Sequence, residues 1–240
     1  HAVSGCPGLE LAVTKRHNDA VTMIGKCVLT GEQGAQLASM DISKERQQDE
    51  GLLPTPSRIP AQIFPPAMTQ TDRRQLIAKH RPDLVLYERL EHPQRHKYTF
   101  VEIKYCRDTQ PTDQVARAEQ QHAELINTLR HHNEAGNITV ELVVLPLGVA
   151  GTMYSSVKTD LQDKLGITGP TLNKLMRKLH YHAINALTKI IRYRRIKMGT
   201  RTGHAHCSAA AGVQIQPAQA RPGKRPILNV RYRPKKRKKR

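Results

Sequence analysis

The sequence is poor in aromatic residues and has no tryptophan. Phenylalanine and tyrosine together account for 4% of the 240 residues, which argues against an aromatic platform that stacks single-stranded nucleic acid. No apolar run approaches the roughly 18 residues of a membrane-spanning helix, and no secretory signal is present. We therefore expect no membrane partner.

Cysteine is also scarce. The four cysteines, at positions 6, 27, 106 and 207, include no pair at CxxC spacing, so the chain alone offers no complete zinc site. This usage predicts a reduced, intracellular protein. The chain begins with His1 rather than methionine, which indicates a fragment or a processed product.

Acidic residues are few beside basic ones. Lysine and arginine number 39 against 20 aspartates and glutamates, giving a net charge of +19 and a pI near 10.1. Such a charge favours a polyanionic partner, and nucleic acid is the leading candidate. The final run PKKRKKR, residues 234–240, suits a nuclear-import signal, a phosphate contact by Lys235, Lys236 and Arg237, or both. We expect a nuclear protein.

Composition divides the chain into four segments. Residues 1–40 carry apolar side chains at helical spacing, and residues 41–70 form a proline-rich stretch typical of a linker. Residues 71–198 alternate strand and helix patterns and predict one α/β domain. Residues 199–240 lose all periodicity and predict a disordered basic tail.

The α/β segment has the element order strand, strand, helix, strand. This order predicts a small mixed β-sheet flanked by helices, with a crossover helix joining two parallel strands. The expected strands cover residues 84–87, 98–105 and 138–144, and the expected helices cover residues 72–79, 113–132, 157–165 and 171–196.

Two carboxylates and a lysine stand on the first two of these strands. Asp83 opens the first, while Glu102 and Lys104 alternate with Val101 and Ile103, so both polar side chains share one face. Magnesium prefers carboxylate oxygens, and phosphodiester cleavage needs a cation of this kind. The pattern predicts a Mg²⁺ or Mn²⁺ site at Asp83 and Glu102, with Lys104 supporting the attacking water. The plainer alternative is a solvated strand face with an ordinary Glu–Lys alternation.

A Pro-Asp pair, an apolar E-x-K strand and a following helix resemble the PD-(D/E)xK restriction-like nucleases. More narrowly, residues 1–150 resemble the C-terminal region of non-LTR retrotransposon reverse transcriptase proteins. There a zinc knuckle ending in H-x4-C precedes an R-H-N or R-H-D tripeptide and then a restriction-like endonuclease. The matching stretches, in the same order, are His1-x4-Cys6, Arg16-His17-Asn18 and Arg81-Pro82-Asp83.

The resemblance implies a restriction-endonuclease-like fold and a DNA endonuclease that nicks target DNA for retroelement integration. Asp83 and Glu102 would bind metal, and Lys104 would assist catalysis. Residues 1–40 would then hold a zinc-knuckle remnant, in which His1 and Cys6 are two zinc ligands that require an upstream pair. The expected partners are DNA and, second to it, the element's RNA.

The tripeptide has two interpretations. Arg16 and His17 would contact nucleic acid or order the knuckle, or His17 is simply a packed residue on the apolar stripe of its helix. The histidines at 122, 131, 132, 180 and 182 are expected to be structural or on the surface. Further nucleic-acid contacts are expected from Arg81 and from the basic face of the last helix, formed by Arg177, Lys178, Arg192, Arg194 and Arg195.

The sequence departs from the retroelement pattern in two ways. Many of those endonucleases carry aspartate as the second acid, where Glu102 stands here. No polymerase motif is present, so no reverse transcriptase activity is expected of these residues. The alternatives are a non-catalytic basic nucleic-acid-binding protein and an inactive retroelement fragment.

Overall fold

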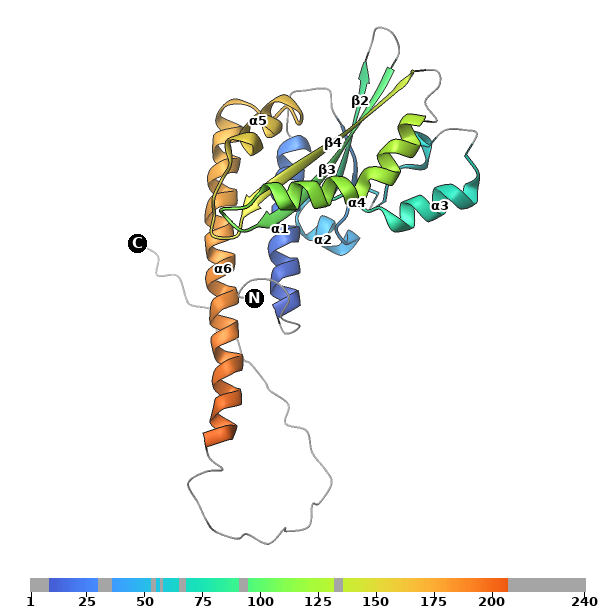
Figure 1. Cartoon of the computed structure of the whole chain (residues 1–240). Coiled ribbons are helices and arrows are strands. Elements are labelled where there is room, and N and C mark those ends of the chain that lie inside the picture. The colour runs from blue at the N-terminus through green and yellow to red at the C-terminus, as the bar shows by residue number, and fades with distance from the viewer. Residues whose placement is uncertain are drawn as a thin grey trace, which may run out of the picture. The chain divides into compact units, whose positions relative to one another are not determined.

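A four-stranded mixed β-sheet organises the fold (Figure 1). The strands lie in chain order across the sheet: β1 (Gln36–Met40), β2 (Leu84–Leu90), β3 (Arg95–Cys106) and β4 (Ile138–Gly148). The first three are antiparallel neighbours, and β3 and β4 are parallel. A parallel pair needs a crossover, which α4 (Thr112–His131) supplies. The predicted α/β class with a small mixed sheet is confirmed.

The structure, a computed structural model, describes residues 9–29, 36–52, 55–56, 58–64, 68–90, 95–131 and 136–206, with backbone alone for residues 62, 90 and 197–206. Residues 1–198 form one compact unit and residues 199–240 form another. The sheet and the candidate site belong to the first unit. Among the helices of the described residues, none is long and apolar enough to cross a membrane.

Two hydrophobic clusters cover the two faces of the sheet. On one face, Val101 and Ile103 of β3 pack with apolar side chains of α1 (Glu10–Leu29), α5 (Ser155–Asp163) and α6 (Gly169–His206). On the other face, Tyr98 and Phe100 pack with α3 (Gln70–Lys79) and α4. Figure 1 shows α1 and α6 running side by side, and α4 crossing the sheet. The alternation along β3 therefore decides which helices each side chain meets.

The helix α4 shows why the sequence folds this way. Its buried side chains are Ala118, His122, Leu125, Ile126 and Leu129, spaced three or four residues apart. This spacing lines one helical face with apolar groups, and that face covers β3 and β4. The prediction of a helix over residues 113–132 agrees with the structure to within one residue.

Several elements differ from the expectation. Residues 36–40 form the edge strand β1, where the sequence predicted only a helical segment. The stretch expected to be a linker contains α2 (Lys44–Asp49) and a short 3₁₀ turn (Ala61–Ile63). It also contributes Ile42 and Phe64 to the buried core, so these residues are part of the folded unit.

The last helix is longer than predicted. The sequence pattern predicted its end near Met198, but α6 continues to His206. Residues 199–206, expected to belong to the disordered tail, are part of this helix. The remainder of the expected tail, including Lys235, Lys236 and Arg237, lies outside the described residues.

Candidate active site

The register of β2 and β3 brings the two predicted acids together. Leu84 of β2 pairs with Val101 of β3. Continued by one residue, this register sets Asp83 opposite Glu102, with about 5 Å between Cβ atoms for such cross-strand neighbours. The backbone N–H of Ile103 donates to Asp83 Oδ2 at 2.6 Å. The acids therefore meet at one end of the sheet.

Glu102 is held by two side chains, Lys104 and His122, on the α4 face of the sheet. Lys104 Nζ donates to Glu102 Oε1 at 2.5 Å, and His122 Nε2 donates to Glu102 Oε2 at 3.0 Å. Lys104 Nζ also donates to Gln121 Oε1 at 3.0 Å. Burial, which leaves Glu102 4% exposed, would raise its pKa, but the hydrogen bonds from His122 and Lys104 outweigh burial and lower the pKa. Glu102 is therefore ionised at neutral pH.

Asp83 is held from the other side by α1. His17 Nε2 donates to Asp83 Oδ1 at 2.7 Å. Burial leaves Asp83 5% exposed and raises its pKa, and the hydrogen bond from His17 offsets this only in part. Burial would lower the pKa of His17, but the hydrogen bond and the negative charge of Asp83 raise it. The pair therefore favours a protonated His17.

Arg16 lies in a different environment from its neighbour His17. It is 3% exposed, and its guanidinium lies 4.1 Å from the centre of the Tyr105 ring. Burial lowers the pKa of Arg16 and raises that of Tyr105 to about 12. This packing does not favour the direct nucleic-acid contact expected of Arg16. His17 instead joins the acidic cluster.

The structure adds two residues of α4 that the sequence interpretation left out of the site, Gln121 and His122. His122 was expected to be structural, and it is fully buried against Glu102. A signal was available, because His122 falls on the apolar stripe of the helix that follows the E-x-K strand. A polar residue on that stripe must find a partner on the covered strand.

Among the described residues, Arg81 and the α6 cations form no ion pair with Asp83 or Glu102. Arg81 pairs with Asp41 at 2.5 Å. Arg177, Lys178, Arg192 and Arg195 are exposed along α6, and Arg194 is half-buried there. His1 and Cys6 lie outside the described residues.

The donor chemistry of the cluster fits a hard divalent cation. Two carboxylates on neighbouring strands are oxygen ligands of the kind that Mg²⁺ accepts. Here His17, Lys104 and His122 donate to them, so protein cations and N–H groups balance the charge that a metal ion would balance. Within the part of the chain that is described, no three histidine, cysteine, aspartate or glutamate side chains are grouped as ligands of one metal ion. A metal ion could therefore bind Asp83 and Glu102 only if some of these hydrogen bonds were broken.

No family model matches the chain, and no curated protein matches it either.

Proposed function

We propose that the protein is a metal-dependent DNA endonuclease that nicks duplex DNA. The observation that carries the proposal is the cluster of Asp83, Glu102 and Lys104, whose members come from two strands and share one end of the sheet. A chance Glu–Lys alternation on a solvated strand does not require a buried aspartate opposite the glutamate. Burial of both acids, which costs free energy, favours a functional origin.

In the proposed mechanism, Asp83 and Glu102 would hold the divalent cation through their carboxylate oxygens. When bound, the cation activates water and neutralises charge on the scissile phosphate. Lys104 positions the attacking water or stabilises the negative charge that develops on the phosphate. His17 and His122 each orient one acid through a hydrogen bond.

We also propose the finer assignments that the motifs suggest. The sheet order and the position of the acids are compatible with a restriction-like fold, and the order of motifs suggests a fragment of a non-LTR retrotransposon protein. The basic run at residues 234–240 supports a nuclear location. A zinc site at His1 and Cys6 would require an upstream pair of ligands in a longer chain.

A second candidate is a non-catalytic nucleic-acid-binding protein. The observation that favours it is the full engagement of both acids: every carboxylate oxygen of Asp83 and Glu102 has a donor within the chain. A buried polar network satisfied in this way also serves as a purely structural device. An inactive retroelement fragment would have the same arrangement.

A plasmid-nicking assay with Mg²⁺ or Mn²⁺ tests the enzyme. Asp83→Ala and Lys104→Ala should each lower the nicking rate by about 100-fold or more, because Asp83 would hold the cation and Lys104 acts at the reacting phosphate. Lys97→Ala is a matched control, since Lys97 lies on the same strand but pairs with Glu141. The control should nick at the parent rate.

Binding of uncut duplex, measured in parallel, separates the two candidates. Variants that bind DNA but do not nick it support the assigned roles. Equal nicking by parent, Asp83→Ala and Lys104→Ala would eliminate the mechanism. A parent protein that binds DNA and never nicks it would favour the non-catalytic candidate.

A further inference from the structure

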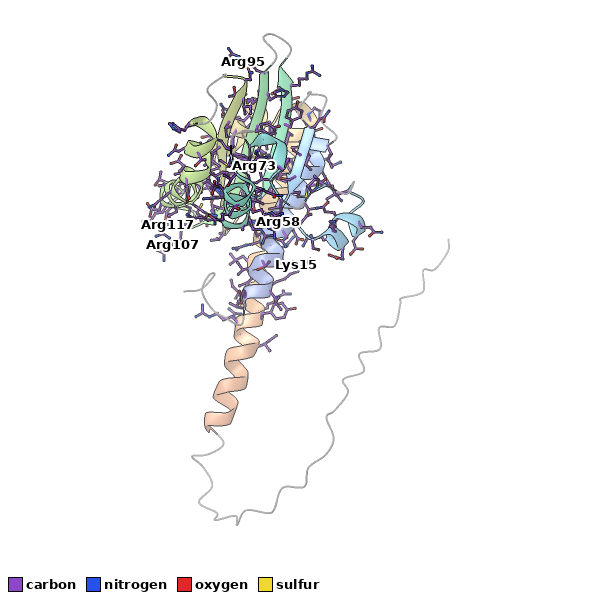
Figure 2. The ribbon with its side chains drawn as sticks, turned by 90° about the vertical axis from the view of Figure 1, so that its right-hand side faces the viewer. Lys15, Arg58, Arg73, Arg95, Arg107 and Arg117 are labelled. Atoms are coloured by element: carbon purple, nitrogen blue, oxygen red, sulfur yellow. The ribbon has the colours of Figure 1, made fainter. Side chains whose placement is uncertain are left out.

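Two exposed arginines flank the acidic cluster at the corner between β3 and α4. Arg107 directly follows β3, and Arg117 lies on α4 one helical turn before Gln121, which accepts a hydrogen bond from Lys104. Within the described residues neither arginine forms an ion pair, and both are exposed. Figure 2 labels Arg107 and Arg117 on the same side of the view.

The sheet separates Glu102 and Lys104 from the core-facing side of α6, while His180 of α6 donates to Gly151 in the loop that binds Asp108. Glu102 and Lys104 lie on the face that α4 covers, as their hydrogen bonds to His122 and Gln121 show. The core residues of α6 belong to the cluster on the opposite face, with Val101 and Ile103. Lys104 therefore faces α4 rather than the core residues of α6.

The acidic residues of the corner leave its positive charge available. Asp108 accepts hydrogen bonds from the backbone N–H groups of Ala150 and Thr152, at 3.0 Å each, and so anchors the corner to the end of β4. Asp113 lies one turn before Arg117, but the two form no ion pair in the described structure. Arginine is well suited to this position, because its planar guanidinium binds phosphate through two N–H groups.

We infer that the phosphodiester backbone of duplex DNA docks on this corner, with Arg107 and Arg117 contacting phosphates next to the bond that faces Lys104. The inference rests on the proposed function, since it takes DNA as the substrate. It reassigns the cleavage-site contacts from α6 to the β3–α4 corner. The α6 cations then contribute general attraction to DNA rather than contacts at the cut.

Binding of a fluorescent duplex in EDTA, where no cutting occurs, tests the surface. The double variant Arg107→Gln/Arg117→Gln should raise Kd by on the order of tenfold and reduce the slope of log Kobs against log salt by about two. The comparison variant Arg192→Gln/Arg194→Gln removes the same charge from α6 and should raise Kd by less than the corner variant does. Thermal melting of both variants verifies that they are folded.

Three results would overturn the inference: an unchanged Kd for the corner variant, a larger loss for the α6 variant, or equal losses for both. Nicking with Mg²⁺ distinguishes this failure from failure of the proposed enzyme. If the parent does not nick but the corner variant binds DNA weakly, the surface stands and the nuclease proposal fails. If the parent nicks and the corner variant binds and nicks as well as the parent, the surface alone is excluded.

Discussion

At the scale of single residues, the cluster consists of two buried carboxylates and the groups that donate hydrogen bonds to them. Asp83 is held by His17 and by a backbone N–H, and Glu102 is held by Lys104 and His122. Removing one member of such a network leaves another polar group buried without a partner, which costs about 1–3 kcal/mol. The histidines are therefore structurally coupled to the acids whatever reaction the acids perform.

The pairing of His17 with Asp83 predicts a pH-dependent contribution to stability. The folded-state pKa of His17 is raised above its unfolded value near 6.5. Its contribution is then fully present below that value and is lost as pH rises through the folded-state pKa. His17→Gln should cost on the order of 1 kcal/mol at pH 6 and less at pH 9. Urea unfolding followed by circular dichroism measures the difference.

The control for this prediction changes Asp83, which accepts a hydrogen bond from His17. In an Asp83→Asn background the hydrogen-bonded carboxylate that raises the pKa of His17 most is gone, so the difference between the costs of His17→Gln at pH 6 and pH 9 should shrink. A cost for His17→Gln in the parent that is equal at pH 6 and pH 9 would show that the ion pair adds nothing to stability.

At the scale of elements, the end of β4 packs closely against the β3–α4 corner, where Asp108 accepts hydrogen bonds from Ala150 and Thr152. A side chain added at Gly148 would place its Cβ 2.1 Å from Asp108 Oδ1 and 2.8 Å from the backbone nitrogen of Thr152. Backbone cannot give way as a flexible side chain can. The glycine therefore allows Asp108 to approach and anchor the corner that carries Arg107.

Gly148→Ala should lower the free energy of unfolding by about 1–3 kcal/mol, because the added methyl group overpacks this junction. Equilibrium unfolding in urea measures the loss. Ser156→Ala, at an exposed position of α5, should change stability by no more than about 0.5 kcal/mol. Equal stabilities of Gly148→Ala and the parent would mean that the corner relaxes freely.

Long periodic elements could be predicted from the sequence, and short or partner-dependent ones could not. The apolar stripe of α4 and the alternation of β3 can be recognised in the sequence because each pattern extends over ten residues or more. The five residues of β1 carry too little pattern, and their pairing with β2 depends on the rest of the sheet.

The same distinction applies to the candidate site. Glu102 and Lys104 could be predicted to share a face because a strand has a period of two. The partners His17 and His122 come from helices on opposite sides of the sheet, 66 and 20 residues from the acids they bind. Their contacts depend on how those helices pack, which local pattern does not encode.

At the scale of the whole molecule, the chain has 39 lysines and arginines against 20 aspartates and glutamates. The resulting net charge of +19 favours binding of any polyanion. Such binding releases counterions, so affinity for duplex DNA should fall steeply with salt, with a slope of about −0.9 per neutralised phosphate. Replacing Lys235, Lys236 and Arg237 by glutamine should reduce the slope by up to about three and weaken binding equally for unrelated DNA sequences. A gel-shift series from low to high salt measures both.

Two results would contradict this expectation. Binding that does not change with salt would exclude phosphate neutralisation as its main source. A sequence-dependent loss in the tail variant would mean that the tail reads bases rather than phosphates.

Under the proposed function, the cross-strand position of Asp83 and Glu102 determines at what stage of folding the protein becomes able to nick DNA. A slip of one residue between β2 and β3 would turn the two carboxylates to opposite sides of the sheet. Net positive charge attracts polyanions whether or not the chain is folded, yet the two acids are paired only when the strands are correctly aligned. Under the proposed function, the ability to cut appears only with the finished fold, and the onset of nicking during refolding would time strand alignment.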